Sequence, residues 1–235
     1  MFRRTLLRAA LLLAAPLAAA ACDQAEPSDF VNQDRIFTEY DLHYDANADR
    51  TVATAVFRFG GPSGTLLELT SPSGVTVNGQ ALSKKVEPIT NRTVYERSFA
   101  GLVQSATFVF TDTEGESYQN TFSLRAIGFP ASVGPIDNDA SYTLPWTGAA
   151  LASDEEVNVV LYRVAGEPEL GVFTQRDDGA QSVILDRAQL QNVQAGQVTL
   201  AMERKFTRTP VQATSSGGRI TGRYTPRNRT AQVTD

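Results

Sequence analysis

The run 45–49 has the clearest metal-ligand spacing in the chain, because it places oxygen-bearing side chains at alternate positions. Asp45, Asn47 and Asp49 match the first three ligand positions of an EF-hand calcium loop. The match ends there, since Arg50 stands where that loop needs glycine and Val56 where it needs glutamate. Asp and Asn are also typical turn residues. The pattern favours a polar hairpin loop, and a weak calcium site with oxygen ligands is the alternative.

Histidine-dependent catalysis would rest on His43, the single histidine among 235 residues. If the surrounding segment is a strand, His43 faces solvent and shares its face with Asp41 and Asp45. The pattern lacks a nucleophile, because no G-x-S-x-G motif occurs and Ser63 and Ser73 lie in turn-like segments. We therefore expect no enzymatic activity and no cofactor.

Charge is distributed unevenly along the chain. The 21 basic and 26 acidic residues give a net charge of −5, which argues against nucleic acid binding. By contrast, residues 204–235 hold seven basic residues and one acid, which gives this stretch a net charge of +6. Such a stretch can bind anionic headgroups, peptidoglycan, a polysaccharide or an acidic partner. Alternatively, its side chains point outward from terminal strands and keep a sheet edge soluble. The acidic run 154–156 is typical of a solvated loop. The candidates for an anionic-partner patch are Arg219, Arg223, Arg227 and Arg229.

The N-terminal segment has the organisation of a secretory signal. Arg3, Arg4 and Arg8 precede an apolar run from Ala9 to Cys22, whose 14 residues fall short of the about 20 that a membrane-spanning helix needs. Cys22 is the only cysteine, so an intramolecular disulfide and a CxxC metal or redox site are excluded.

The segment Leu17-Ala-Ala-Ala-Ala-Cys22 resembles the lipobox of bacterial lipoproteins. The resemblance implies that residues 1–21 are removed as a signal peptide and that Cys22 is acylated. It also implies a location in the bacterial cell envelope, at the inner membrane, the outer membrane or the cell surface. Ordinary secretion, with cleavage after Ala21 and a free Cys22, is the alternative. The polar residues that follow predict a lipidated N terminus and flexible tether over 22–33.

From Ile36 onward, apolar and polar residues alternate with a period of two, which predicts strands. Asn78-Gly79 is a two-residue hairpin signal between two such runs. Glycine and proline over 128–135 interrupt the pattern and predict a domain boundary. A helical turn is expected over 188–193, and no long amphipathic helix is present. In the second run, Asn158, Val160 and Tyr162 share the face opposite to an apolar one.

The two runs resemble tandem immunoglobulin-like or fibronectin-type modules of bacterial surface proteins, in the region of Trp146 and in the approach to a strand over 196–200. The cysteine pair of antibody domains is absent. The resemblance implies an all-β fold of two antiparallel β-sandwiches, over 34–128 and 135–235. A single larger sandwich is the alternative.

Together these features predict a membrane-anchored cell-envelope lipoprotein with a non-catalytic structural or interaction role, whose partners are the membrane and an envelope protein or polysaccharide. The alternative is a surface module that binds carbohydrate or peptide. The placement of aromatic residues separates the two. Trp146 or several tyrosines exposed on a concave surface favour ligand binding, and buried aromatics favour the structural role.

Overall fold

The computed structural model describes residues 25–163 and 169–235, and nearly all regular structure in these ranges is strand. The signal peptide 1–21 and Cys22 lie outside the described residues. Over these described residues, the helical elements are the short η1 (Ser28–Phe30), η2 (Gln33–Arg35) and α1 (Arg187–Leu190). Within the described ranges, no helix has both the length and the apolar character needed to span a bilayer. The prediction of an all-β fold is confirmed.

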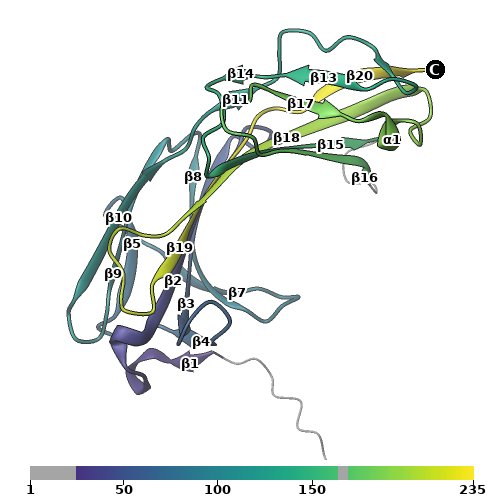
Figure 1. The fold of residues 1–235 in the computed structure, drawn as a ribbon. Helices are drawn as coiled ribbons and strands as arrows, with labels where there is room; N and C mark the ends of the chain where they lie inside the picture. The colour runs from purple at the N-terminus through teal and green to yellow at the C-terminus, as the bar shows by residue number, and fades with distance from the viewer. Residues whose placement is uncertain (1–24, 164–168) are drawn as a thin grey trace, which may run out of the picture.

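One sheet of twelve strands runs through the molecule (Figure 1). In spatial order, its central path is β1 (Glu26–Pro27), β4 (Thr65–Glu68), β3 (Arg50–Phe59), β2 (Ile36–Asp45), β19 (Gly218–Thr225), β18 (Gly196–Arg208), β15 (Glu155–Tyr162) and β16 (Glu169–Gln175). The strands that pair beside this path are β7 (Ser83–Val86), β8 (Thr93–Ala100), β12 (Ile136–Asp137) and β20 (Arg229–Thr234).

Three smaller sheets form the second layer. The first contains β10 (Ser117–Ser123), β9 (Ser105–Thr111), β5 (Gly74–Val77) and β6 (Gln80–Ala81). The other two are the pairs β11 (Ile127–Gly128) with β14 (Thr147–Gly148), and β13 (Tyr142–Pro145) with β17 (Ser182–Leu185).

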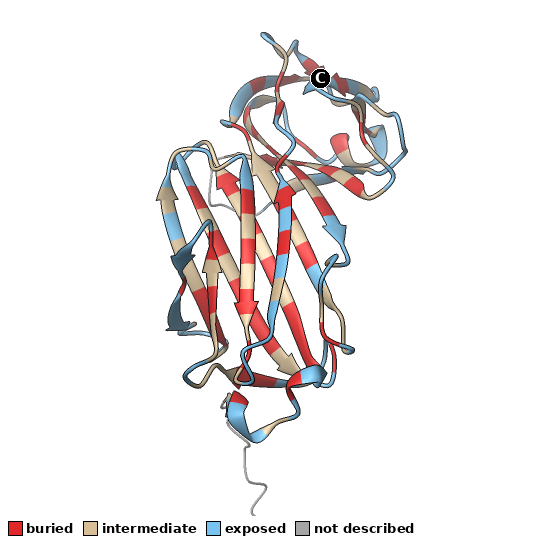
Figure 2. Ribbon diagram, turned by 90° about the vertical axis from the view of Figure 1, so that its left-hand side faces the viewer, coloured by how far each residue is buried: buried red, intermediate tan, exposed pale blue. Residues whose placement is uncertain are grey.

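The first core lies between the sheet of β5, β9 and β10 and the inward face of β2, β3 and β19. Buried and less buried residues alternate along these strands, as a half-buried sheet requires (Figure 2). Aromatic rings fill the space between the layers: Tyr40 meets Phe108 at a centroid distance of 4.9 Å, and Phe57 meets Phe110 at 4.7 Å. We call this part, β1–β10 with β19, the first lobe.

The second core is aliphatic apart from Trp146 and two phenylalanines, and it joins β13 and β17 to β15, β18 and β20. Leu144 and Leu185 of the second layer and Leu161 and Leu200 of the main sheet belong to this core, and all four are fully buried. We call this part, β11–β17 with β20, the second lobe.

The long strand β18 belongs to both lobes. Its first residues, Gly196–Leu200, pair with β20, and its last, Arg204–Arg208, pair with β19. Strand β19 in turn pairs in parallel with β2 along its whole length. Phe206 and Ile220 therefore complete the first core. The ranges 34–128 and 135–235 do not each contain a complete core, and the division of the chain into two domains stays a prediction.

Two local predictions are confirmed. Asn78 and Gly79 join β5 to β6 with φ values of 49° and 75°, the left-handed backbone that a type I′ turn requires. The helical turn expected over 188–193 is present as α1, and the side chain of Asp186 caps its N terminus.

The described part of the predicted tether is docked rather than flexible. Strand β1 pairs in parallel with β4, and Ser28 is fully buried. The Oγ of Ser28 accepts a hydrogen bond from the Thr70 amide at 2.9 Å, and its carbonyl accepts one from Nε2 of Gln33 at 2.7 Å. The prediction of a flexible tether over 22–33 is therefore wrong for 25–33, because these polar side chains bond to the protein instead of to water.

Candidate binding surface on the concave sheet face

The main sheet curves so that the outward face of β8, β3, β2, β19, β18 and β15 lies on its concave side (Figure 1). In β2, Tyr40 and Leu42 point into the first core, so the residues that alternate with them, such as Asp41, point outward. The register carries this outward face across six strands in one row, Ser98, Val52, His43, Arg223, Lys205 and Glu156, and across five in the next, Glu96, Thr54, Asp41, Thr221 and Thr207. We call this surface the concave face. It also includes Glu39, Arg219, Glu203, Asn158, Val160 and Tyr162.

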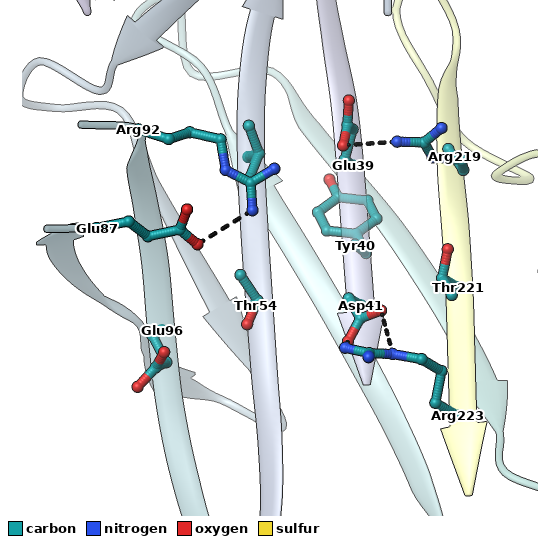
Figure 3. Close-up of a pocket in the computed structure, with 11 residues that line it drawn as sticks. Glu39, Tyr40, Asp41, Thr54, Glu87, Arg92, Glu96, Arg219, Thr221 and Arg223 are labelled. Atoms are coloured by element: carbon teal, nitrogen blue, oxygen red, sulfur yellow. Dashed lines mark hydrogen bonds and ion pairs between the residues drawn. The ribbon is translucent and has the colours of Figure 1, made fainter. Parts of the chain in front are cut away.

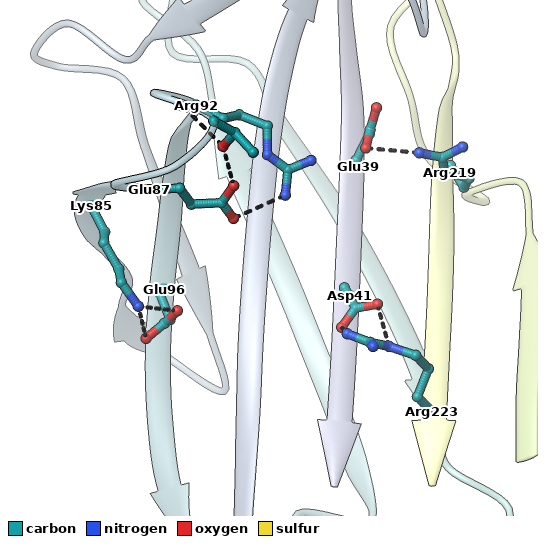
Figure 4. Close-up of polar contacts among 9 residues, drawn as sticks. Glu39, Asp41, Lys85, Glu87, Arg92, Glu96, Arg219 and Arg223 are labelled. Atoms are coloured by element: carbon teal, nitrogen blue, oxygen red, sulfur yellow. Dashed lines mark hydrogen bonds and ion pairs between the residues drawn. The ribbon is translucent and has the colours of Figure 1, made fainter. Parts of the chain in front are cut away.

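Cross-strand ion pairs cover the centre of the concave face (Figure 4). Arg223 donates two hydrogen bonds to the carboxylate of Asp41, at 2.8 and 3.1 Å, and Arg219 contacts Glu39 at 2.9 Å. Further along, Lys205 contacts Glu156 at 3.1 Å. Such partly exposed pairs contribute about 0–1 kcal/mol each to stability. Their main effect is to leave this surface polar but close to neutral.

A pocket of about 290 Å³ lies at the first-lobe end of the concave face (Figure 3). Glu39, Asp41 and Thr54 belong to its floor, and Glu87 and Arg92, which flank the turn between β7 and β8, line it beside them. Hydrogen bonds from Thr90 and Arg92 lower the pKa of Glu87 below its ordinary value. The lining is rich in donors and acceptors of both charges.

Burial changes the titration of two residues on this face. Burial is the largest effect on Glu203 and raises its pKa above the ordinary value, although the positive charges of Arg223 and Lys205 act to lower it. It also lowers the pKa of His43, and the positive charge of Arg223 adds to this effect. Nε2 of His43 lies 3.0 Å from the hydroxyl oxygen of Thr225. His43 therefore has the outward direction that the alternation predicts, but it is partly buried and hydrogen-bonded.

The second-lobe end of the concave face is less polar. Val160 and Tyr162 point outward from β15, as their alternation predicts, and both are partly exposed. Val172, opposite Val160 on β16, is 41% exposed. The surface therefore combines a charged first-lobe half with an apolar second-lobe end that includes one tyrosine.

Trp146 and three of the other tyrosines are buried. Trp146 is 6% exposed, and its Nε1 donates a hydrogen bond to the carbonyl of Ala149. Tyr40, Tyr44 and Tyr95 also belong to the first core. Trp146 therefore does not form the exposed platform that would favour stacking on a ligand.

The structure separates the four predicted arginines into two pairs. Arg219 and Arg223 lie on the concave face and are paired with acids of β2, so they do not form a free basic patch. Arg227 and Arg229 are exposed and line a different shallow pocket beside Phe129. An anionic-partner site stays a prediction for this second pair.

The loop of Asp45, Asn47 and Asp49 joins β2 to β3 as a polar hairpin turn. The Asp45 carboxylate accepts hydrogen bonds from the backbone and side chain of Asn47, and Asp49 accepts one from the Tyr44 hydroxyl. The Asn47 side chain accepts a hydrogen bond from the Asn228 amide at 2.9 Å. Among the described residues, no group of three or more His, Cys, Asp or Glu is placed to hold a metal ion. The contacts agree with the favoured interpretation as a turn.

The sequence patterns did not single out most residues of the pocket. Glu39, Thr54 and Glu96 belong to no motif, and only the outward phase of their strands could have indicated them. The pairing of β3 with β2 and β8 brings these residues together. Arg219 and Arg223 join the pocket through the pairing of β2 with β19, which are about 180 residues apart and whose contact leaves no local signal.

No known family model matches the chain, and no curated protein matches it. Among solved structures, the chain is similar to the SGBP-B protein of the mixed-linkage glucan utilization locus of Bacteroides ovatus, solved in complex with a mixed-linkage heptasaccharide. The two are 10% identical with a TM-score of 0.25, and the match covers 89% of this chain and 65% of that one.

Proposed function

We propose that the chain is a non-catalytic, lipid-anchored protein of the bacterial cell envelope, and that it binds a neutral polysaccharide on the concave face. The observation that carries the proposal is the surface itself: five strands present an uninterrupted row of polar side chains from Glu96 to Thr207, with a pocket at one end of the concave face and Tyr162 at the other. Sugar hydroxyls both donate and accept hydrogen bonds, so they suit a lining of acids, arginines and threonines.

The charge balance of the concave face favours a neutral ligand. Because Arg219 and Arg223 are matched by Glu39 and Asp41, this surface offers no excess positive field to a polyanion. A bound peptide strand would instead use the backbone groups of a sheet edge, and the concave face exposes side chains.

The non-catalytic part of the proposal rests on how the reactive groups are engaged. His43 bonds to Thr225, and the carboxylates of Glu39 and Asp41 bond to arginines. The His43 imidazole does contact a hydroxyl, but among the described residues no carboxylate is hydrogen-bonded to the imidazole, so the third, orienting group of a catalytic triad is not in place.

The test is calorimetric titration with a panel of neutral glucans, mannans and xylans, and with alginate as an anionic comparison. We expect binding to a neutral polymer, weakened roughly tenfold in Asp41→Asn and in Tyr162→Ala, because the loss of one charged hydrogen bond or aromatic contact is worth about 1–3 kcal/mol. Asp139→Asn, which removes an exposed carboxylate of an ion pair on the second lobe, is the matched control and should bind as the parent does.

Binding of no neutral polymer, or equal binding by all variants, would contradict the proposed ligand. Chromatography of the recovered polymer tests the non-catalytic part, since shortened chains would show hydrolysis. Mass spectrometry of the membrane fraction tests the anchor, which requires an acylated Cys22 in the parent and a Cys22→Ser variant that is released from the membrane.

A structural role with a protein partner is the second candidate, because the burial of Trp146 removes the most common platform for sugar stacking. A photo-crosslinker in place of Thr54, on the concave face, would then give one defined adduct in cells. The same crosslinker at Asp139 would give none.

A further inference from the structure

An exposed aromatic side chain lies at the end of the first lobe where the described chain begins. Phe30 is 82% exposed and lies in η1. Both ribbon views place the segment 25–35 at the end of the molecule opposite to the C terminus (Figures 1 and 2). Phe30 therefore lies at an extremity of the fold.

The exposure of Phe30 is built into the fold. Ser28, two residues before Phe30, is fully buried and bonded to Thr70 and Gln33, and β1 just before it is paired with β4. These contacts hold the backbone of η1 in place, so the ring is held out from the protein surface.

The charged neighbours of Phe30 permit contact with lipid. Two of the three acids in this segment are engaged with the protein, since Asp29 accepts a hydrogen bond from the Thr70 hydroxyl at 3.0 Å and Asp34 accepts one from the Ser215 amide at 3.0 Å, whereas Glu26 is exposed. Arg35 is exposed, lies over the ring of Phe59 at 5.2 Å, and has no acidic partner among the described residues. An exposed guanidinium and an exposed aromatic ring in the same segment, 25–35, suit a phospholipid headgroup layer.

The distance to the proposed anchor is short. Cys22 and Ala25 are three residue steps apart, which span at most about 11 Å even when fully extended. Acyl chains on Cys22 would therefore hold the 25–35 end of the first lobe against the bilayer surface.

We propose that this end of the first lobe is a membrane contact surface, with the Phe30 ring in the headgroup region of the bilayer and Arg35 beside it. The proposal rests on the acylation of Cys22 proposed above. It places the second lobe at the end of the molecule away from the membrane, with the concave face between the two.

The test uses the full acylated protein in vesicles of phosphatidylethanolamine and phosphatidylglycerol that contain a dibrominated phosphatidylcholine, which quenches nearby tryptophan fluorescence. Phe30→Trp reports on the proposed contact. Ile184→Trp is the matched control, because Ile184 is also an exposed apolar residue, at 57%, but belongs to the second lobe. The parent chain, with only the buried Trp146, supplies the background signal.

We expect bromolipid to quench the Phe30→Trp signal several-fold more than the Ile184→Trp signal. Equal, weak quenching in both variants of an acylated protein would overturn the membrane contact and leave the anchor intact. If mass spectrometry finds no acyl group on Cys22 and the protein stays off the vesicles, both the anchor and the contact are overturned. If, without vesicles, a rising protein concentration protected the Phe30→Trp fluorescence from a water-soluble quencher, this surface would be assigned to a second copy of the chain. That result would also overturn the proposal.

Discussion

The ion pair between Glu155 and Arg204 shows how far a single residue can depart from its local sequence. Glu155 stands in an acidic run that is typical of a solvated loop, yet its side chain is 0% exposed and its Arg204 partner 2%. Arg204 also donates hydrogen bonds to the carbonyls of Ala149 and Ala150 at 2.7 and 2.8 Å. The pair therefore ties the segment before β15 to β18, where the two lobes meet.

We expect Arg204→Ala to lower the free energy of unfolding by about 3–5 kcal/mol, because it leaves the buried Glu155 carboxylate without its buried guanidinium, with only the partly exposed Arg125 at 3.5 Å and the Ala152 amide beside it. Arg208→Ala is the matched control on the same strand. Its pair with Asp154 is partly exposed, so its loss should cost about 0–1 kcal/mol. Urea unfolding of the two variants measures the difference. Equal losses of stability would show that the buried Glu155 pair matters no more for stability than the partly exposed pair of Arg208.

The titration of His43 gives a second prediction at this scale. Its pKa is lowered in the folded chain by burial and by Arg223, whereas the unfolded chain takes up a proton near the ordinary value of 6.5. As the pH falls below that value, the unfolded chain binds the proton more readily, so stability decreases until the pH reaches the folded pKa.

We expect His43→Gln to lose less stability than the parent over this acidic interval, since glutamine has no proton to gain and can still bond to Thr225. The measurement is the free energy of unfolding across a pH series. Parallel pH profiles for parent and variant would show that His43 does not contribute.

At the scale of elements, alternation and turn chemistry were sufficient to predict local structure. The outward direction of Tyr162 and the turn at Asn78-Gly79 follow from short-range sterics and from the two-residue period of a strand. The docking of 25–33 could not be predicted in this way, because the bonds of Ser28 go to Thr70, more than forty positions away.

The β5–β6 turn offers a matched pair of glycine substitutions. Gly79 has a φ of 75°, so Gly79→Ala should destabilise the chain by about 1–2 kcal/mol, the cost of a left-handed conformation for an L residue. Gly74, in the same hairpin, has no positive φ and has open space where a Cβ would lie. Gly74→Ala should therefore change stability by less than about 1 kcal/mol. Thermal unfolding of both variants measures the difference. A larger loss of stability in Gly74→Ala than in Gly79→Ala would contradict the left-handed conformation assigned to Gly79.

At the scale of the whole molecule, the sheet connects the lobes so closely that the first should not fold alone. A fragment of residues 25–128 lacks β19, which supplies eight paired residues to β2, and it lacks Phe206 and Ile220 of the first core. We expect this fragment to show no cooperative unfolding transition, while residues 25–235 unfold cooperatively. Circular dichroism during heating measures both, and a sharp transition in the fragment would contradict the shared-core arrangement.

The sequence by itself determined the class of fold, the phase of each long strand and the turns between adjacent strands, because these depend on residues a few positions apart. It also contains the lipobox-like segment, which lies outside the described structure. Only the tertiary structure decided which strands are neighbours. The parallel pairing of β2 with β19 neutralises Arg219 and Arg223, completes the first core and assembles the concave face. A period of two specifies which way a side chain points, but the neighbour it meets across the sheet depends on register between strands far apart in the chain.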